Sequence, residues 1–365
     1  MPGSCDLLVV SHACVLAENQ RVYAELATRG ADVRLVVPAR WRDTYRPEGY
    51  AAQVAEGLEG RVTELRVLGA GRPQRHVHLA RARSVLASLR PRAVLIEEEP
   101  FSLAASQWSS AARHAGVPFG VQLAETMDRA LPRAVATMRD RVLSSAAFVL
   151  ARSPGAAALA SHWGASGAVV VVAHGVDDTG ARPTPDGAFT VAYVGRLVEV
   201  KGVLDLLEAV RSLDGAVRLV VAGDGPLAGA VRDGGAHVEY LGAVRHEGIG
   251  EVYARAHATC VPSRTSATWE EQFGRVLVES LVRAVPVVAT RTGEIPWVVA
   301  SAGGGVLVEQ RDPAGLAAAL GALAADRERA EALGAQGRAG ALATFTNAAA
   351  AGQIASLLGG LSAPR

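Results

Sequence analysis

The chain has 365 residues, of which 50% are hydrophobic, and its formal net charge is +1. This length predicts two domains rather than one, and the apolar content is ample for two hydrophobic cores, so a disordered chain is excluded. The near-zero charge and the lack of a basic tail argue against nucleic acid and an anionic membrane as partners.

The three cysteines, Cys5, Cys14 and Cys260, are an odd number without C-x-x-C spacing. This usage is typical of reduced thiols in the cytoplasm rather than of a disulfide framework. The longest apolar runs are far shorter than a membrane-spanning helix. We therefore expect a cytoplasmic protein without stable membrane insertion. The sequence predicts no metal site and no cofactor, and it leaves the oligomeric state open.

The first half of the chain alternates between predicted strands and helices. Buried strands are predicted at 7–10, 33–38, 93–96, 117–123, 146–151 and 169–173, with helices at 19–28 and before 89. This βαβ order predicts a parallel sheet whose carboxyl edge carries the ligand-binding loops. His12 and Asn19 lie in the first such loop, where ligand contact and simple roles as turn residue and helix cap are equally compatible with the sequence.

Acidic residues follow two of these strands. Glu97, Glu98 and Glu99 come directly after the strand at 93–96, and Glu125 follows the strand at 117–123. A solvated loop is one interpretation of the three acids, and a helix N-cap region is the alternative for Glu125. Because the three acids lie at the predicted ligand-facing edge, we interpret Glu99 as a site residue.

A hinge is predicted at 179–189, which is rich in Gly, Pro, Thr and Asp and has little apolar periodicity. The next predicted strand, 190–194, is followed by Gly195, Arg196 and Lys201, the only lysine of the chain. Arg196 offers a planar fork for a phosphate, and Lys201 offers a point charge. Two solvated basic side chains at a helix start are the weaker interpretation, since positive charge there is unfavourable without an anion.

Glu271 and Glu279 flank the predicted start of a helix near Phe273 and Gly274. Their spacing is slightly more than two helical turns, so both carboxylates can face one crevice. The free N–H groups of the first turn favour an anion there. Carboxylates that bind hydroxyls beside amides that hold a diphosphate suit a sugar nucleotide. For the glutamate pair alone, a solvated helix face is the alternative.

Several motifs together resemble family 4 glycosyltransferases of the GT-B fold. They are Glu271-x7-Glu279 with Phe273-Gly274 between the glutamates, G-R-x4-K-G at 195–202, G-x-G-P at 223–226 and H-G-V-D at 174–177. The E-E-P-x-S run at 98–102 and W-x-E-Q-F-G at 269–274 resemble a bacterial subset of that family. The chain departs from the pattern at Arg283-Ala284, where the family has a small residue and Gly, and at Asn347, where it has an aromatic residue.

The resemblance implies an α/β chain of GT-B fold, in which two Rossmann-like domains face a central cleft. Its expected parts are an acceptor-binding domain at 1–178, a linker at 179–189, a nucleotide-sugar-binding domain at 190–346 and a C-terminal helix at 347–365 that crosses back to the first domain. The implied activity is retaining, metal-independent, hexosyltransferase-type transfer from a UDP- or GDP-linked sugar to an acceptor. We expect a small-molecule or specialised-metabolite acceptor, because no strongly basic, amphipathic helix is evident in the first domain, and a glycan or lipid is equally compatible with the sequence. No cofactor is implied.

The resemblance also assigns roles to single residues. Arg196 and Lys201 hold the donor diphosphate, Glu271 the transferred sugar and Glu279 the ribose, and Glu125 lies near the reacting sugar; Arg196, Lys201, Glu271 and Glu125 form the expected catalytic set. The expected donor-binding residues are Gly195, Arg196, Lys201, Gly242, Val244, Glu271, Gln272, Phe273, Gly274, Arg275, Val276 and Glu279. The expected acceptor-binding residues are His12, Asn19, Glu99, Ser102, Glu125 and Thr126.

Two alternatives remain at this point. One is a sugar-nucleotide epimerase or phosphorylase on the same fold, and the other is a non-catalytic bilobal binding protein. The presence of Arg196, Lys201, Glu271 and Glu279 favours an enzyme over the binding protein. The nucleotide base, the sugar, the acceptor and the bond made, to O, N or S, stay open.

Overall fold

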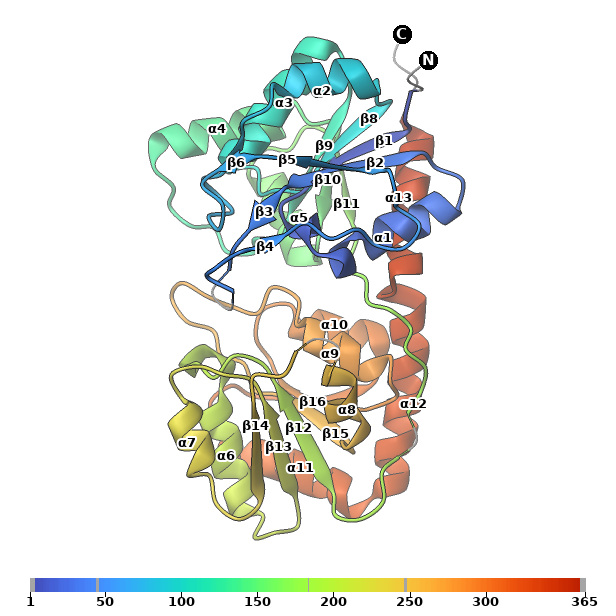
Figure 1. Cartoon of the computed structure of the whole chain (residues 1–365). Coiled ribbons are helices and arrows are strands. Elements are labelled where there is room, and N and C mark those ends of the chain that lie inside the picture. Colours follow the sequence, from blue (N-terminus) through green and yellow to red (C-terminus); the bar gives the residue numbers. More distant parts are fainter. Residues whose placement is uncertain (1–3, 44–45, 183, 246–247, 362–365) are drawn as a thin grey trace. The chain divides into compact units, whose positions relative to one another are not determined.

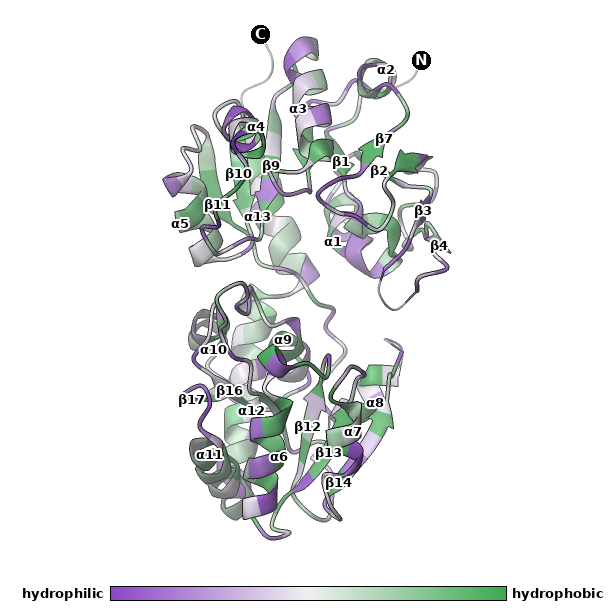
Figure 2. Cartoon of the chain, turned by 90° about the vertical axis from the view of Figure 1, so that its left-hand side faces the viewer, coloured by the Kyte–Doolittle hydropathy of each residue, from purple (hydrophilic) through white to green (hydrophobic). Residues whose placement is uncertain are grey.

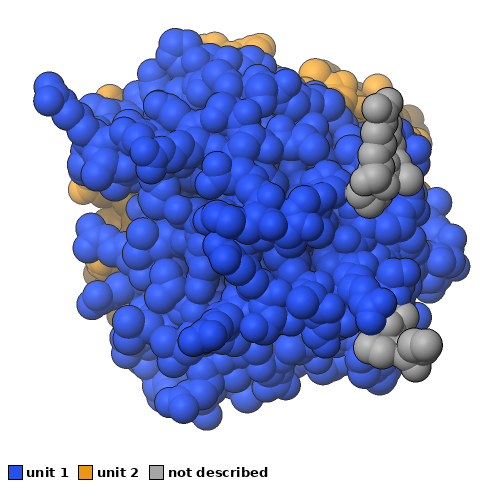
Figure 3. All heavy atoms as spheres, turned by 90° about the horizontal axis from the view of Figure 1, so that it is seen from above, with its two compact units in different colours: residues 1–175, 347–365 blue, residues 176–346 orange. Residues whose placement is uncertain are grey.

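The computed structural model describes residues 4–43, 46–182, 184–245 and 248–361. It divides the chain into two compact units, 1–175 with 347–365 and 176–346 (Figures 1 and 3). We expected the first domain to end at 178, and the expected linker 179–189 belongs to the second unit. The outermost residues of the expected ranges, 1–3 and 362–365, and linker residue 183 lie outside the described residues.

The first unit contains a seven-stranded parallel sheet with the order β11-β10-β9-β8-β1-β2-β5. Its strands are β1 (Leu7–Val10), β2 (Val33–Pro38), β5 (Val62–Leu65), β8 (Ala93–Ile96), β9 (Phe119–Leu123), β10 (Phe148–Ala151) and β11 (Ala168–Val171). The central strands are buried on both faces by two hydrophobic clusters, as continuous apolar runs predict. Figure 2 shows the hydrophobic residues along β10 and β11.

The helices of the first unit include the last helix of the chain. They are the 3-10 helix η1 (Ala13–Val15), α1 (Ala17–Thr28), α2 (Ala82–Leu89), α3 (Leu103–Ala115), α4 (Arg133–Leu143), α5 (Pro154–His162) and α13 (Asn347–Gly360). α13 packs beside α1 (Figure 1), and its Ala350, Ala351 and Ile354 are buried in the same cluster as Leu26. The C-terminal helix thus completes the core of the first unit.

The stretch between β2 and α2 forms two small antiparallel pairs. They are β3 (Arg40–Trp41) with β4 (Tyr50–Ala51), and β6 (Val67–Leu68) with β7 (Val77–His78). None of these strands was predicted from the sequence, because two-residue strands have no apolar periodicity. They matter for function because Trp41 and His78 flank the carboxyl edge of the sheet near His12.

The second unit contains a six-stranded parallel sheet with the order β14-β13-β12-β15-β16-β17. Its strands are β12 (Thr190–Val194), β13 (Arg218–Ala222), β14 (Val238–Gly242), β15 (Ala258–Val261), β16 (Val287–Thr290) and β17 (Gly305–Val308). Its helices are η2 (Glu199–Lys201), α6 (Val203–Ser212), α7 (Ala228–Arg232), α8 (Ile249–Ala254), α9 (Arg275–Leu281), α10 (Ile295–Ala302), α11 (Pro313–Ala325) and α12 (Arg327–Thr344).

The helices of the second unit pack against the core with one side, and their sequences are amphipathic accordingly. Figure 2 shows hydrophobic and hydrophilic residues alternating around α6, whose Val203, Leu206 and Val210 are buried in the core.

The three cysteines of the chain are buried and unpaired. Within the described ranges, none of the helices has both the length and the apolarity that a bilayer crossing requires.

Candidate functional site

Lys201 is placed by a tight turn that follows β12. The chain leaves the sheet after Val194 and forms η2, which ends at Lys201. Gly202 then adopts a left-handed backbone with a φ of 68°, and a Cβ atom there would lie 1.8 Å from the carbonyl oxygen of Pro262. Only glycine permits such an approach, so this turn fixes Lys201 beside the loop that follows β15.

Lys201 and Glu271 form a direct ion pair. Lys201 Nζ lies 2.6 Å from Glu271 Oε2, and the Ser263 hydroxyl donates a hydrogen bond of 3.0 Å to the same oxygen. The lysine ammonium also lies 4.8 Å from the centre of the Trp269 ring. Glu271 is only 8% exposed, so its charge is held in place by the lysine and the hydroxyl. The structure therefore joins the basic and the acidic motif predicted from the sequence.

A hollow of about 190 Å³ lies beside this ion pair. It is lined by residues from the carboxyl ends of β12 and β15, by Lys201 and Glu271, and by the start of α9, namely Gly274, Arg275 and Val276. α9 begins where the sequence predicted it, with Gly274 as the left-handed N-cap residue at a φ of 77°. Five of the expected donor-binding residues therefore line one hollow at the carboxyl edge of the second sheet.

Glu279 does not line the hollow but contacts a residue that does. Its Oε1 accepts a hydrogen bond of 3.0 Å from Arg275 Nε, and its Oε2 accepts one of 3.3 Å from the Tyr253 hydroxyl. Arg275 lines the hollow, whereas Glu279 is not among the lining residues. The carboxylate thus reaches the hollow chiefly by holding the arginine.

The other expected donor-binding residues differ in which of their atoms are available to a ligand. The Phe273 ring packs against Trp297 and Phe345 at centroid distances of 6.2 and 5.7 Å, so only its backbone is available to a ligand. Arg196 is exposed, directly after Gly195. Gln272 is half-buried and Val244 packs beside a small core cluster, while the Gly242 carbonyl accepts the Gly223 N–H at 2.8 Å.

At the carboxyl edge of the first sheet, His12 is tied to Glu98. The His12 backbone N–H donates to Glu98 Oε1 at 2.8 Å, and His12 Nδ1 lies 2.6 Å from Glu98 Oε2. Burial alone would lower the pKa of His12, but the Glu98 carboxylate outweighs burial and raises it. Burial likewise raises the pKa of Glu98, yet His12 and His76 hold it at about 2. Each group therefore favours the charged form of the other.

Glu99 and Glu125 lie close to each other at the ends of β8 and β9. Glu99 Oε1 accepts the Ala124 N–H at 3.0 Å, and its buried Oε2 has no hydrogen-bond partner among the described residues. Burial raises the pKa of Glu99 to about 7, and the Glu125 charge adds to this shift. Glu125 accepts the N–H groups of Thr126 and Met127, each at 3.1 Å. The carboxylate of Glu125 thus orders the loop that carries Thr126.

Two of the expected acceptor residues have structural roles. Asn19 lies inside α1, which begins two residues before the predicted start, and its Nδ2 donates to the Ala13 carbonyl at 2.8 Å. Ser102 is buried and caps α3 by accepting the Ala105 N–H at 3.1 Å. Both side chains hold the loops of the carboxyl edge in shape.

Sequence reasoning missed three residues that complete these sites. Ser263 contacts Glu271, and Trp41 and His76 pack around His12 at centroid distances of 5.0 and 5.4 Å. Ser263 directly follows the apolar run of β15, which is a usable signal. Trp41 and His76 come from a stretch without periodicity, so no local pattern identifies them.

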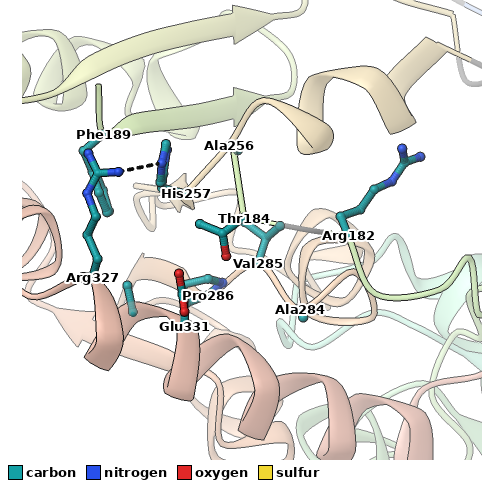
Figure 4. Close-up of a pocket in the computed structure, with 11 residues that line it drawn as sticks. Arg182, Thr184, Phe189, Ala256, His257, Ala284, Val285, Pro286, Arg327 and Glu331 are labelled. Carbon is teal, nitrogen blue, oxygen red and sulfur yellow. Dashed lines mark hydrogen bonds between the residues drawn. The ribbon is translucent and has the colours of Figure 1, made fainter. Parts of the chain in front are cut away.

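A second hollow in the same unit lies at the opposite edge of the sheet (Figure 4). Phe189, His257 and Pro286, which line it, directly precede β12, β15 and β16. Arg327 Nη1 lies 3.4 Å from His257 Nε2 there. Because ligands of parallel α/β sheets bind at the carboxyl ends of the strands, the hollow beside Lys201 is the candidate donor site.

Family models match both halves of the chain. Residues 17–175 match the model described as "Glycosyl transferase 4-like domain", and residues 178–340 match the model described as "Glycosyl transferases group 1". The two matches adjoin each other and follow the division into two units.

Two curated relatives share about a third of their aligned residues with this chain. A D-inositol 3-phosphate glycosyltransferase of Corynebacterium kroppenstedtii is 33% identical over 41% of this chain and 36% of the relative. A GDP-mannose-dependent α-(1-6)-phosphatidylinositol monomannoside mannosyltransferase of Mycobacterium tuberculosis is 31% identical over 56% of this chain and 60% of the relative. The chain thus spans between about a third and three fifths of the length of these relatives.

Solved structures match nearly the whole chain. HepE of Anabaena in complex with UDP is 18% identical, has a TM-score of 0.75 and covers 98% of this chain and 100% of its own. Sucrose-phosphate synthase of Thermosynechococcus elongatus is 19% identical, with a TM-score of 0.73 and coverage of 97% and 98%. These likenesses confirm the predicted GT-B fold of two Rossmann-like domains.

Proposed function

Because the chain carries a glycosyl transferase 4-like domain followed by a glycosyl transferases group 1 domain in a GT-B fold, we propose that it is a retaining glycosyltransferase. It takes a sugar from a nucleoside diphosphate sugar bound by the second unit. It passes this sugar to a small-molecule acceptor bound by the first unit.

The observation that carries this proposal is the ion pair beside the hollow of the second unit. Lys201 Nζ lies 2.6 Å from Glu271 Oε2, and both residues line the hollow. An ammonium here stabilises the negative charge that develops on a leaving diphosphate. The adjacent carboxylate accepts hydrogen bonds from sugar hydroxyls. One hollow thus offers the two groups that a nucleotide sugar needs.

The proposed reaction breaks the bond between the anomeric carbon and the diphosphate oxygen. The acceptor attacks from the face that the diphosphate leaves, so the anomeric configuration is retained, and a phosphate oxygen takes the acceptor's proton. Arg196 and Lys201 hold the diphosphate without a metal ion at that position. Glu271 positions the transferred sugar and does not act as a nucleophile.

The donor base is tested by a thermal-shift panel of UDP, GDP, ADP and TDP. We expect one of them to raise the melting temperature of the second unit by several degrees, since a ligand at about 100 times its Kd stabilises by about 2.7 kcal/mol. GDP and UDP come first, because one relative is a GDP-mannose-dependent enzyme and the structurally similar HepE was solved in complex with UDP. Glu279→Ala should largely remove the shift, and Glu208→Gln, an exposed change on α6, should not. No shift with any of the four would contradict the proposal.

The transfer reaction should not need magnesium or manganese. After EDTA treatment, we expect addition of either ion to leave the transfer rate within about twofold, because Arg196 and Lys201 supply the positive charge at the diphosphate. The measurement is release of nucleoside diphosphate in the presence of acceptor. Loss of transfer in EDTA with recovery in magnesium or manganese would disprove the metal-free diphosphate site.

A further inference from the structure

Three side chains from distant parts of the first unit converge at the carboxyl edge of its sheet. His12 follows β1, His76 precedes β7 and Glu98 follows β8. Their ligating atoms all lie within 4.8 Å of one another. Glu98 lies between the rings, with Oε2 at 2.6 Å from His12 Nδ1 and Oε1 at 3.5 Å from His76 Nε2. The sequence predicts no metal site here, because the three residues are far apart along the chain.

The inner histidine carries the decisive observation. His76 is completely buried, and its Nδ1 lies 2.9 Å from the Pro73 carbonyl oxygen, which can only accept a hydrogen bond. Nδ1 is therefore the nitrogen that donates to the backbone, and Nε2 is the nitrogen directed at Glu98. That Nε2 has no hydrogen-bond partner among the described residues. Its separation of 3.5 Å from Glu98 is too long for an ordinary hydrogen bond.

A buried ring nitrogen and a buried carboxylate that face each other without a hydrogen bond are stabilised by a cation between them. In metal-binding histidines, one ring N–H is usually held by a backbone carbonyl or a carboxylate, which leaves the other nitrogen to bind the ion. We propose that His12 Nδ1, His76 Nε2 and the Glu98 carboxylate bind a divalent transition-metal ion of the zinc class. The inference does not depend on the transferase activity.

The donor set selects the class of ion. Two imidazoles and one carboxylate suit zinc and its neighbours, whereas magnesium and calcium prefer oxygen ligands throughout. Zinc bonds to such ligands are about 2.0–2.2 Å long. To admit an ion, His12 Nδ1 and Glu98 Oε2 need to separate by roughly 1 Å or less from their present contact.

Access to the cluster is from one side. The His12 side chain is 22% exposed and the Glu98 side chain 1%, while Trp41 packs on both imidazoles at centroid distances of 5.0 and 5.1 Å. Three protein ligands leave a fourth position of a tetrahedral ion open. Water or an oxygen or sulfur atom of a ligand would fill that position.

The test is a cobalt titration of the chelator-treated full chain. We expect one equivalent of Co²⁺ to give visible d–d absorption bands, which one equivalent of Zn²⁺ removes and an excess of Mg²⁺ does not. His12→Ala and His76→Gln should each weaken Co²⁺ binding by about a hundredfold or more, because even an outer-shell partner is worth about 10–100-fold. The exposed histidine of α3, in the variant His114→Ala, serves as the matched control and should bind as the parent does.

The outcomes are distinct. Absence of stoichiometric bands in the parent, displacement of Co²⁺ by Mg²⁺, or unchanged binding in the His12 variant would each overturn the site. Circular dichroism verifies the fold of each variant. If His76→Gln does not fold, the partly exposed His12 still decides the question, and loss of binding in His12→Ala alone supports the site.

Discussion

Lys201→Ala should lower kcat/KM for transfer by about a hundredfold or more, a loss of roughly 3 kcal/mol of transition-state stabilisation. The ammonium is the group that directly faces Glu271 in the hollow, at 2.6 Å from its carboxylate. Its removal takes away the charge that stabilises the leaving diphosphate and leaves Glu271, which is 8% exposed, with the Ser263 hydroxyl. Steady-state release of nucleoside diphosphate in the presence of acceptor measures the effect.

The matched control is Arg211→Ala, an exposed cation on α6 of the same unit. It should remain within about twofold of the parent, since exposed charges far from the hollow contribute little. Thermal melting of both variants separates a loss of catalysis from a loss of fold. A Lys201→Ala enzyme within a few-fold of the parent in kcat/KM would remove this lysine from the catalytic set.

Replacing Glu279 and Glu125 should affect different steps. Glu279→Ala should weaken binding of the nucleoside diphosphate by about 10–100-fold. We propose that this carboxylate binds the ribose, and such a contact contributes about 1.5–3 kcal/mol to ground state and transition state alike. The same change frees Arg275, which lines the hollow. The donor KM should therefore rise with little change in kcat. Calorimetry with the nucleotide identified by the thermal-shift panel measures the binding directly.

Glu125→Gln should leave nucleotide binding unchanged and lower turnover by about 10–100-fold. The amide oxygen of glutamine still accepts the N–H groups of Thr126 and Met127 that the carboxylate accepts now, so the loop should keep its shape. Exposed Glu56 in the first unit and Glu208 in the second are the controls. Weak nucleotide binding in the Glu125 variant with normal binding in the Glu279 variant would indicate that the first unit binds the donor. That result would contradict the proposed division between the units.

The sequence predicted the central strands well and the irregular stretches poorly. β1, β2, β8 and β12 have the predicted bounds, because strands buried on both faces form continuous apolar runs between polar loops. β9 begins at Phe119 rather than at 117, since Pro118 has no N–H for the ladder. The stretch between β2 and α2 shows neither the helical nor the strand period of apolar residues. Its short strands depend on tertiary contacts that no local pattern reveals.

For the candidate site, motif spacing predicted which loops meet but not which way each side chain points. The proximity of Lys201 and Glu271 followed from placing both motifs at one sheet edge. The direction of Phe273 did not, because its ring is fixed by Trp297 and Phe345, which come from α10 and the end of α12. The contact of His76 with His12 and Glu98 depends on a long loop and is likewise visible only in three dimensions.

The packing of α13 into the first unit has a consequence for how the chain folds as it is made. The first unit is discontinuous, and its last helix is the last element of the chain. During synthesis, all of 176–346 has left the ribosome before Ala350, Ala351 and Ile354 can cover the apolar surface around Leu26. Domains generally fold as units as they emerge. The inserted second unit therefore completes its fold first, and the unit that contains the N-terminus completes its fold last.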